Sequence, residues 1–484
     1  MSSVQWVRMH ATLSRMEVAD PSLGLIEHFH AAACDLGIDS CVVASAQYSS
    51  VAKDDSATPS DAQLRFALAQ MIAEQPALGA QLIVNTSGVP TFVRLRSIDL
   101  SHAIEYAAPT VDVQEAFRSQ LCTSFQAGCE RPLWRVMVLK DGHILFAYHH
   151  AIADGQSGVS FHMALLKALN GLPDALEDPP TVVDLTPTTN FLPPIEKLTS
   201  TRVSLRTLSR ETYGLLAPQS LKPGRRAWTG NPVAKVPTVV TIVDLWYLSP
   251  ADAARLLGIC REQKCTLTGF IHTLCAEAFS RVLATHAPEV LAKCKSICTI
   301  TAVSLRRYSG TPIEIICDQP SAIQSYVRIT RSPGGDSTSD SSSFPPFPFA
   351  KAVKFSGKLH AKLHVACEEV GALWYLFGRL REYFQGKLGK KRQGTFTLSN
   401  IGRFPSPSPS SGDGDTLGRW KVGEMYFGQC DSTVGAAIKI NVVGGGDGSV
   451  TATFTRGESS LDEKVAKEFI RVVKEWTQSV LASS

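Results

Sequence analysis

The sequence predicts an α/β protein built from two domains of ordinary size. The chain has 484 residues, of which 44% are hydrophobic, and this is enough material for two hydrophobic cores. Helical and strand-like patterns alternate on both sides of a proline-rich stretch, from about Pro173 to Val236, where both patterns weaken. We therefore expect an N-terminal lobe over residues 1–190, a crossover over 191–236 and a C-terminal lobe over 237–484.

In the first half, hydrophobic periodicity predicts helices and strands in turn. Residues 133–139 and 143–149 read as two strands joined at Asp141-Gly142, a dipeptide typical of a β-hairpin turn. The strand of residues 143–149 is therefore expected to have a neighbour on one side. The other expected elements are helices over 60–74, 113–125 and 157–169, and strands over 80–84 and 91–95.

In the second half, helix-capping residues mark several element boundaries. Ser249-Pro250 and Thr266 have the form of helix starts, and Ser460 to Glu463 resembles a capping box before a final helix. Residues 334–348 and 405–415 are rich in Ser, Pro, Gly and Asp, and we expect mobile surface insertions there. The remaining expected elements are a helix over 202–216 and strands over 239–248, 297–303, 421–427, 434–442 and 449–455.

Charge and cysteine usage exclude several function classes. The net charge is +4 without a long basic run, which argues against a nucleic-acid partner. Residues 1–15 lack the apolar core of a signal peptide, and no apolar run is long enough to span a membrane. The twelve cysteines contain no CxxC pair, so we expect free thiols, no bound metal and no bound cofactor. A cytoplasmic, monomeric protein is expected.

The most informative stretch runs from Ile144 to Gly155 and places two adjacent histidines, a carboxylate and a glycine after a strand. Strand alternation would put His150 on the face of Ile144, Phe146 and Tyr148, and His149 on the opposite face. Only one of the two imidazoles can then line a given cavity. A neutral imidazole is well suited to take a proton from an alcohol near neutral pH, so one of the two is a candidate general base.

The string His149-His150-Ala151-Ile152-Ala153-Asp154-Gly155 resembles the HHxxxDG signature of the chloramphenicol-acetyltransferase-like acyltransferases. These include the plant BAHD enzymes and the condensation domains of peptide synthetases, and the likeness is greatest to the fungal alcohol acetyltransferase family. Phe396-Thr397-Leu398-Ser399-Asn400-Ile401-Gly402 resembles the second motif of that group, and the likeness spans most of the chain. The resemblance implies two chloramphenicol-acetyltransferase-like lobes, each a mixed β-sheet with flanking helices, and a tunnel between them.

The resemblance also implies roles for the motif residues. It makes His150 the general base and leaves His149 to packing and loop shape. For Asp154 it implies a structural ion pair with an arginine of the second half, for which Arg306 is the first candidate and Arg307 the alternative. Candidates for oxyanion stabilisation and tunnel lining are the Gly155 backbone N–H, Thr397, Ser399 and Asn400.

One departure from the plant enzymes limits this transfer of roles. Their DFGWG motif is missing, and the nearest strand reads Met425-Tyr426-Phe427-Gly428-Gln429. Assignments of the donor site that rest on the plant motif therefore do not carry over.

The functional expectation is an acyl-CoA-dependent O-acyltransferase, acetyl-CoA being the donor that the family implies. The acceptor would be an alcohol or a hydroxylated secondary metabolite. Alternatives are a carrier-protein thioester as donor, an amine as acceptor, or a binding protein of the same fold without catalysis.

A serine hydrolase is disfavoured because Gly155-Gln156-Ser157-Gly158 is followed by Val159, where a nucleophile elbow needs glycine. A metal site formed by His149, His150 and Asp154 is disfavoured because opposite-facing neighbours converge poorly.

Overall fold

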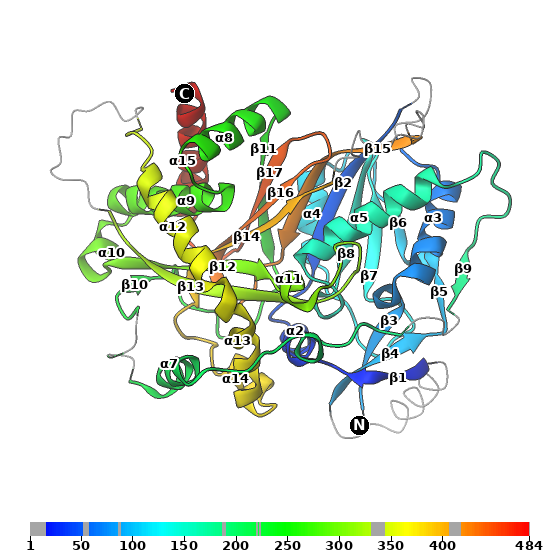
Figure 1. The fold of residues 1–484 in the computed structure, drawn as a ribbon, viewed down its shortest axis with the longest axis horizontal. Coiled ribbons are helices and arrows are strands. Elements are labelled where there is room, and N and C mark those ends of the chain that lie inside the picture. Colours follow the sequence, from blue (N-terminus) through cyan, green and yellow to red (C-terminus); the bar gives the residue numbers. More distant parts are fainter. Residues whose placement is uncertain are drawn as a thin grey trace.

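A computed structural model describes residues 16–51, 58–85, 89–185, 190–218, 221, 224–330, 344–405 and 418–483. Its two large mixed sheets lie side by side, with the first half of the chain around one and most of the second half around the other (Figure 1). The fold class expected from the sequence, mixed α/β with two lobes, is confirmed.

The N-terminal sheet has the strand order β15-β2-β8-β7-β6. Its members are β2 (Val42–Ser50), β6 (Ile104–Tyr106), β7 (Trp134–Val138), β8 (His143–Tyr148) and β15 (Trp420–Gln429). The expected hairpin is present as β7 and β8, and Gly142 in its turn has a φ of 92°, a conformation that favours glycine. Strand β15 comes from the C-terminal part of the chain and pairs antiparallel with β2, so this sheet is completed across the two halves.

Both faces of this sheet are covered by helices, as strand alternation requires. Phe146 and Tyr148 pack against α5 (Gly155–Asn170) and α3 (Asp61–Glu74). Leu145 and Ala147, which point the opposite way, pack against α4 (Val113–Leu121) and against Val243 of the other lobe. Helix α4 therefore lies between the lobes.

The C-terminal sheet has the order β10-β12-β14-β16-β17-β11, with β13 paired to β12. Helices α9 (Leu267–His286) and α15 (Glu463–Ala482) cover it, and their Phe279 and Phe469 stack with ring centroids 4.0 Å apart. Its strands are β10 (Ala227–Trp228), β11 (Thr241–Leu248), β12 (Ser296–Ser304), β13 (Pro320–Arg328), β14 (Gly394–Arg403), β16 (Ala436–Gly444) and β17 (Val450–Gly457).

Two smaller sheets and several short helices complete the described part of the chain. The small sheets are β1-β4-β3 and β5-β9. Their strands are β1 (Met16–Ser22), β3 (Ala80–Val84), β4 (Pro90–Leu95), β5 (Ser97–Asp99) and β9 (Val182–Asp184). The further helices are α2 (Leu25–Asp35), α6 (Ile195–Leu198), α7 (Leu205–Leu216), α8 (Pro250–Glu262), α10 (Pro288–Lys293), α11 (Arg306–Ser309), α12 (Phe349–Lys362), α13 (Ala366–Gly371) and α14 (Leu380–Gln385).

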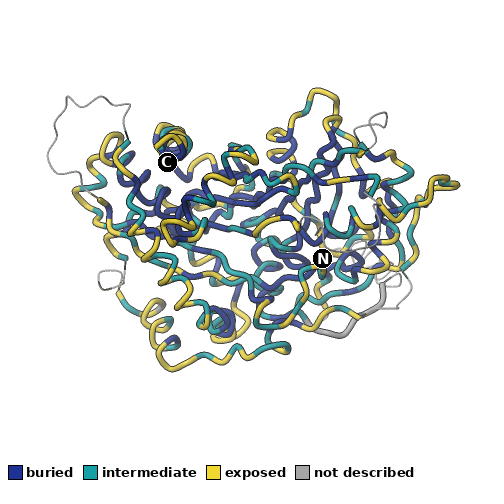
Figure 2. Tube along the Cα trace, turned by 45° about the horizontal axis from the view of Figure 1, so that its top comes forward, coloured by how far each residue is buried: buried dark blue, intermediate teal, exposed yellow. Residues whose placement is uncertain are grey.

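Buried residues gather in the two sheets and in the faces of the helices that contact them (Figure 2). The twelve cysteines are all free, as their spacing predicted. Within the described residues, the helices are too short or too polar to cross a lipid bilayer.

The structure corrects some local expectations. The final helix is capped by Asp462, whose side chain accepts from Lys464 and Val465 N–H, whereas Ser460 donates instead to the carbonyls of Ala437 and Gly457. Helix α4 ends at Leu121, four residues earlier than expected. Of the expected insertions, residues 334–343 and 406–415 lie outside the described residues.

Candidate active site

The histidine motif spans the junction of strand β8, a short 3-10 helix η3 (His150–Ile152) and helix α5. The expected alternation holds along β8 but ends with it at Tyr148. His149 is the N-cap of η3, with an extended backbone, and His150 is the first residue of η3. The two imidazoles therefore lie where the strand passes into the turn.

His149 is used for local structure. It is 4% exposed, and its Nδ1 accepts a hydrogen bond of 3.0 Å from the Ala151 N–H, which caps η3. Burial, helped by the neighbouring His30 and His150, lowers the pKa of His149 to about 3. This imidazole is therefore neutral at physiological pH and already committed to the turn.

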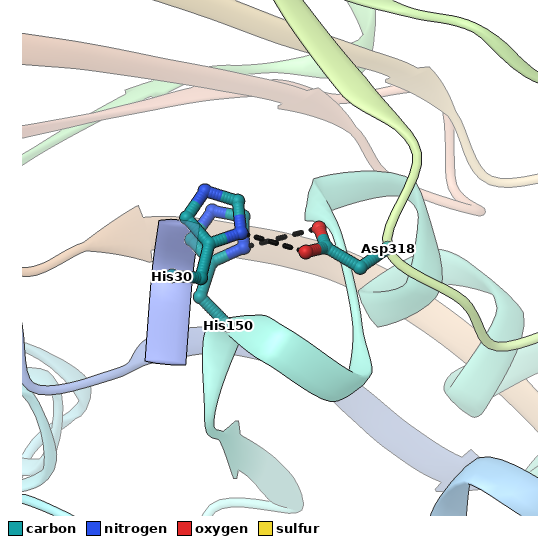
Figure 3. Close-up of side chains that lie close together, drawn as sticks. All are labelled: His30, His150 and Asp318. Atoms are coloured by element: carbon teal, nitrogen blue, oxygen red, sulfur yellow. Dashed lines mark hydrogen bonds and ion pairs between the residues drawn. The ribbon is translucent and has the colours of Figure 1, made fainter. Parts of the chain in front are cut away.

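His150 lies beside a carboxylate that the motif does not contain. Its Nδ1 is 3.4 Å from Oδ1 of Asp318, which precedes β13 in the second half of the chain (Figure 3). That distance is long for a hydrogen bond, and both atoms lack a well-formed hydrogen-bond partner among the described residues. The contact still faces Nδ1 toward the carboxylate, so the other ring nitrogen, Nε2, points away from Asp318.

A third side chain, His30 of α2, completes the cluster. Its Nδ1 is 2.6 Å from Oδ2 of Asp318, and its ring stacks on that of His150 with centroids 3.8 Å apart (Figure 3). The side chain of Asp318 is fully buried, while those of His30 and His150 are 12% and 18% exposed. The two imidazoles therefore reach the accessible surface and the carboxylate does not.

The charges of this cluster are set by burial and by each other. Burial works against the charged form of Asp318, but the two imidazoles outweigh it and lower its pKa. Burial lowers the pKa of His30, whereas for His150 the close contact with Asp318 and the charge of that carboxylate overcome the effect of burial and raise the pKa. Near neutral pH the site thus holds an ionised carboxylate, a neutral His30 and a His150 of increased basicity.

Asp154, the carboxylate of the motif, has a structural contact of its own. Its Oδ1 lies 3.0 Å from Nη2 of Arg306, and the side chains are 3% and 6% exposed. Arg306 is thus the ion-pair partner of Asp154, while Arg307 has no ion pair among the described residues. Asp154 also caps α5 by accepting from the Ser157 N–H at 2.9 Å, and its own N–H donates to the Cys317 carbonyl. These bonds tie the start of α5 to the segment that carries Asp318.

The serine-hydrolase interpretation does not fit the position of Ser157. Its hydroxyl is fully buried, donates to Asp154 and to the Cys317 carbonyl, and accepts from Arg306. No histidine of the described residues contacts it in these bonds, so a base for its activation is missing.

His149, His150 and Asp154, which the sequence analysis disfavoured as a metal site, do not converge as a set, because Asp154 is bound to Arg306 and His149 to the turn. Among the described residues a different trio, His30, His150 and Asp318, has its possible ligand atoms within 4.8 Å of one another. In the structure these atoms contact each other directly through the 2.6 Å bond. The absence of a bound metal therefore stays a prediction.

The second motif lies on β14 and contacts the first through Gly155. A side chain at Gly155 would place its Cβ 2.7 Å from Ile401 and 2.9 Å from Phe427, so glycine is required there by close packing. A left-handed backbone conformation is not the reason for glycine here, because Gly155 is absent from the glycines with positive φ. Asn400 donates to Thr268 and accepts from the Gly402 N–H, so its amide is held in the strand end.

A cavity of about 370 Å³ borders the cluster, a size within the range of small-molecule sites. Its lining includes Asp318 of the cluster, but neither of the two imidazoles, together with Phe92 and Phe191, whose ring centroids are 5.7 Å apart. The lining is predominantly apolar, which suits a hydrophobic ligand.

His30 and Asp318 were missed by sequence reasoning. His30 and Asp318 both lie in segments in which the sequence analysis found no motif. Their meeting with His150 depends on α2 and the start of β13 crossing at the histidine turn, which only the fold reveals.

Comparison with known proteins agrees with this geometry. A family model described as alcohol acetyltransferase matches residues 109–302, which include the histidine motif. A probable alcohol acetyltransferase, FCK4 of Fusarium pseudograminearum, is 30% identical over 438 residues, covering 83% of this chain and 84% of that protein. A probable alcohol acetyltransferase, crmB of Aspergillus fumigatus, is 25% identical over 91% of this chain and 96% of its own length.

Solved structures share the fold at low sequence identity. The TRI3 trichothecene 15-O-acetyltransferase of Fusarium sporotrichioides superposes with a TM-score of 0.67 at 11% identity, covering 96% of each chain. The first condensation domain of the calcium-dependent antibiotic synthetase gives 0.59 at 13% identity, covering 97% of this chain and 98% of its own. The extent of the sequence match to FCK4, across most of both proteins, shows that this chain belongs to the alcohol acetyltransferase family.

Proposed function

We propose that this protein transfers an acyl group, acetyl in the first instance, from a CoA thioester to the hydroxyl of a small molecule. The observation that carries the proposal is the partly exposed His150, whose Nδ1 faces an ionised carboxylate and whose Nε2 is left to accept a proton. An imidazole in this state is a general base.

The reaction would proceed without a covalent enzyme intermediate. Nε2 of His150 takes the proton of the hydroxyl as the oxygen attacks the thioester carbonyl. The tetrahedral intermediate then collapses, the carbon–sulfur bond breaks, and the departing CoA thiolate takes the proton back from the imidazolium. General-base assistance of this kind contributes typically about 10²- to 10⁴-fold to the rate.

Asp318 supports the base in two ways. Its negative charge favours the imidazolium that forms during attack, and its position favours the tautomer with the proton on Nδ1. The assignment differs from the role of the motif carboxylate, Asp154, which is bound to Arg306 and holds the turn.

The oxyanion formed on the acyl oxygen needs hydrogen-bond donors. The Gly155 N–H, at the N-terminus of the sixteen-residue helix α5, is the candidate that lies in the same turn as His150. Thr397 and Ser399 on β14 remain further candidates, whereas the Asn400 amide already donates to Thr268.

The neighbouring apolar cavity supports a hydroxylated acceptor with a hydrophobic body. The aromatic and aliphatic walls favour an alcohol or a hydroxylated secondary metabolite over a sugar or another strongly polar acceptor. Because an apolar lining can accept many hydroxylated compounds, the test must cover several chemical classes of acceptor.

The test incubates the purified protein with acetyl-CoA and a panel of aliphatic alcohols, hydroxylated terpenoids and polyketides, and matched amines. Release of CoA thiol and formation of the ester or amide are measured by absorbance and mass spectrometry. We expect acceptor-dependent ester formation that is unaffected by EDTA. Product from amines alone, transfer only from an acyl carrier protein, or ligand binding without turnover would each contradict the proposal.

A further inference from the structure

His30 lies on helix α2, far from the motif in sequence, yet its imidazole is in direct contact with the candidate base. His28 is two residues earlier on the same helix, about 200° around its axis, and has no ion pair among the described residues. Only His30 therefore points toward η3. The contact is specific to one of two histidines on this helix.

The two imidazoles share Asp318 unequally. Nδ1 of His30 lies 2.6 Å from Oδ2 of Asp318, whereas Nδ1 of His150 lies 3.4 Å from Oδ1. An ionised carboxylate can only accept, so Nδ1 of a neutral His30 must carry the proton that it donates. The contact of Asp318 with His150, the candidate base, is consequently weaker than its hydrogen bond with His30.

Stacking adds an orientational constraint. The rings of His30 and His150 lie 3.8 Å apart between centroids with planes inclined by 26°. Rotation of His150 about its Cβ–Cγ bond would tilt its ring into that of His30. The same side chain thus limits the rotation of His150 and holds the carboxylate at its edge.

Few other charges face this cluster, and they come from several elements. Burial, with the charges of Asp318 and Glu196, raises the pKa of Glu27, so Asp318 is the principal local anion. The groups that face His30, His150 or Asp318 are His149 of the turn, Tyr148 of β8, Glu27 of α2, Asp39 after α2 and Cys317 beside Asp318.

We propose that His30 is a positioning residue for acyl transfer, which divides the carboxylate of Asp318 with His150 and fixes the ring of His150 by stacking. The activity measurements that test this role rest on the proposed function, whereas the protonation state of His30 can be measured independently of it. His30 would restrain both the orientation and the basicity of His150 without touching substrate.

Two substitutions separate the two roles of His30. His30→Phe keeps a ring for stacking and removes the N–H, while His30→Asn keeps an N–H at the position of Nδ1 and removes the ring. Freed from His30, Asp318 should bind His150 fully, so the acidic limb of the kcat/KM profile in His30→Phe should move up by about one pH unit. In His30→Asn the limb should stay in place and the plateau of kcat should fall about tenfold.

His28→Phe is the matched control on the same helix, and we expect a wild-type pH profile for it. An acidic limb at the wild-type pH in His30→Phe, or equal shifts in His30→Phe and His28→Phe, would overturn the proposal. An unchanged pH profile and an unchanged plateau of kcat in every His30 variant that folds would also overturn it, because they would leave only a structural role.

A measurement on the unsubstituted full chain covers the case in which the variants do not fold. ¹⁵N NMR of histidine-labelled protein, with His150→Gln to identify that ring, reports the tautomer of each imidazole. We expect His30 to be neutral at pH 7 with its proton on Nδ1, and His150 to titrate at a higher pH than His30. A cationic His30, or one protonated on Nε2, would refute the proposal. If no acceptor is acetylated, the proposed function fails while this test of the shared carboxylate stands.

Discussion

The two oxygens of Asp318 serve different imidazoles, and this division determines how the candidate base behaves. A carboxylate beside a histidine stabilises its protonated form and so raises the pH at which it becomes a free base. The raised pKa of His150 is a consequence of that neighbour, since burial by itself acts in the opposite direction.

This predicts the position of the acidic limb of the pH–rate profile. Because the base must be neutral, kcat/KM should fall as pH drops through the pKa of His150, which lies above the ordinary histidine value of 6.5. Replacing Asp318 by Asn removes the charge, so the limb should move to lower pH while kcat falls. Measurement of kcat/KM between pH 5 and 9 checks both effects, and an upward or absent shift would count against the assignment.

At the residue scale the sequence motif singled out His149, His150 and Asp154, and Arg306 was its first candidate for the partner that Asp154 has in the structure. The sequence was not sufficient for His30 and Asp318. A contact between α2 and the residue before β13 depends on how three separate elements meet, and neither segment has a distinctive pattern.

At the scale of elements, the ion pair of Asp154 and Arg306 fastens helix α5 to the loop that carries Asp318. Both partners are buried, so removal of one leaves an uncompensated charge, which typically costs about 3–5 kcal/mol. Asp154 also caps α5, and loss of such a cap costs about 1 kcal/mol more.

Asp154→Ala should therefore lower the melting temperature strongly and reduce activity together with it. Asp174→Ala is the control, because Asp174 pairs with Arg419 while its side chain is 94% exposed, and exposed pairs contribute little. Scanning calorimetry of both variants checks the prediction. Similar melting temperatures for the two would mean that the buried pair does not hold the turn.

The contact between the two motifs predicts a second element-scale effect. In Gly155→Ala the new methyl group would lie under 3 Å from both Ile401 and Phe427, so β14 and β15 would have to move away from α5. We expect lower stability and a reduced kcat, whereas Gly258→Ala, in open space inside helix α8, should leave kcat unchanged and should not lower stability. Thermal melting and initial rates compare the two, and a stable, fully active Gly155→Ala would argue against close packing at the motif.

At the scale of the whole molecule, sequence patterns predicted the two-lobe α/β fold and most helices and strands, because hydrophobic period and caps are local signals. The pairing of β15 with β2 could not be predicted, since a strand pattern in the second half gives no partner. Likewise the sequence at Ser460 matched a capping box, but the Ser460 side chain hydrogen-bonds instead to the carbonyls of Ala437 and Gly457. Contacts across the chain determine these details.

Three histidines buried in different parts of the molecule predict sensitivity to acid. Burial lowers the pKa of His149, His162 and His272 to about 3 each, so below pH 6.5 the unfolded chain binds protons that the folded chain does not. The free energy of unfolding should fall with decreasing pH, by up to about 1.4 kcal/mol per pH unit for each such histidine. His150, whose pKa is raised, contributes with the opposite sign only above pH 6.5.

Urea denaturation between pH 7 and pH 4.5 measures this slope. Removal of one buried imidazole in His272→Gln should reduce it, while His102→Gln, on a side chain that is 57% exposed, should leave it unchanged. A free energy of unfolding that is constant over this range would show that these histidines are protonated in the folded protein.

The central claim is that the imidazole of His150 removes the proton of the accepting hydroxyl. The most direct measurement is the rate of acetyl ester formation from acetyl-CoA by His150→Ala, at saturating acceptor and with circular dichroism to establish that the variant is folded. We expect a loss of about 10²- to 10⁴-fold in kcat. Turnover at the wild-type rate by the folded variant would contradict it.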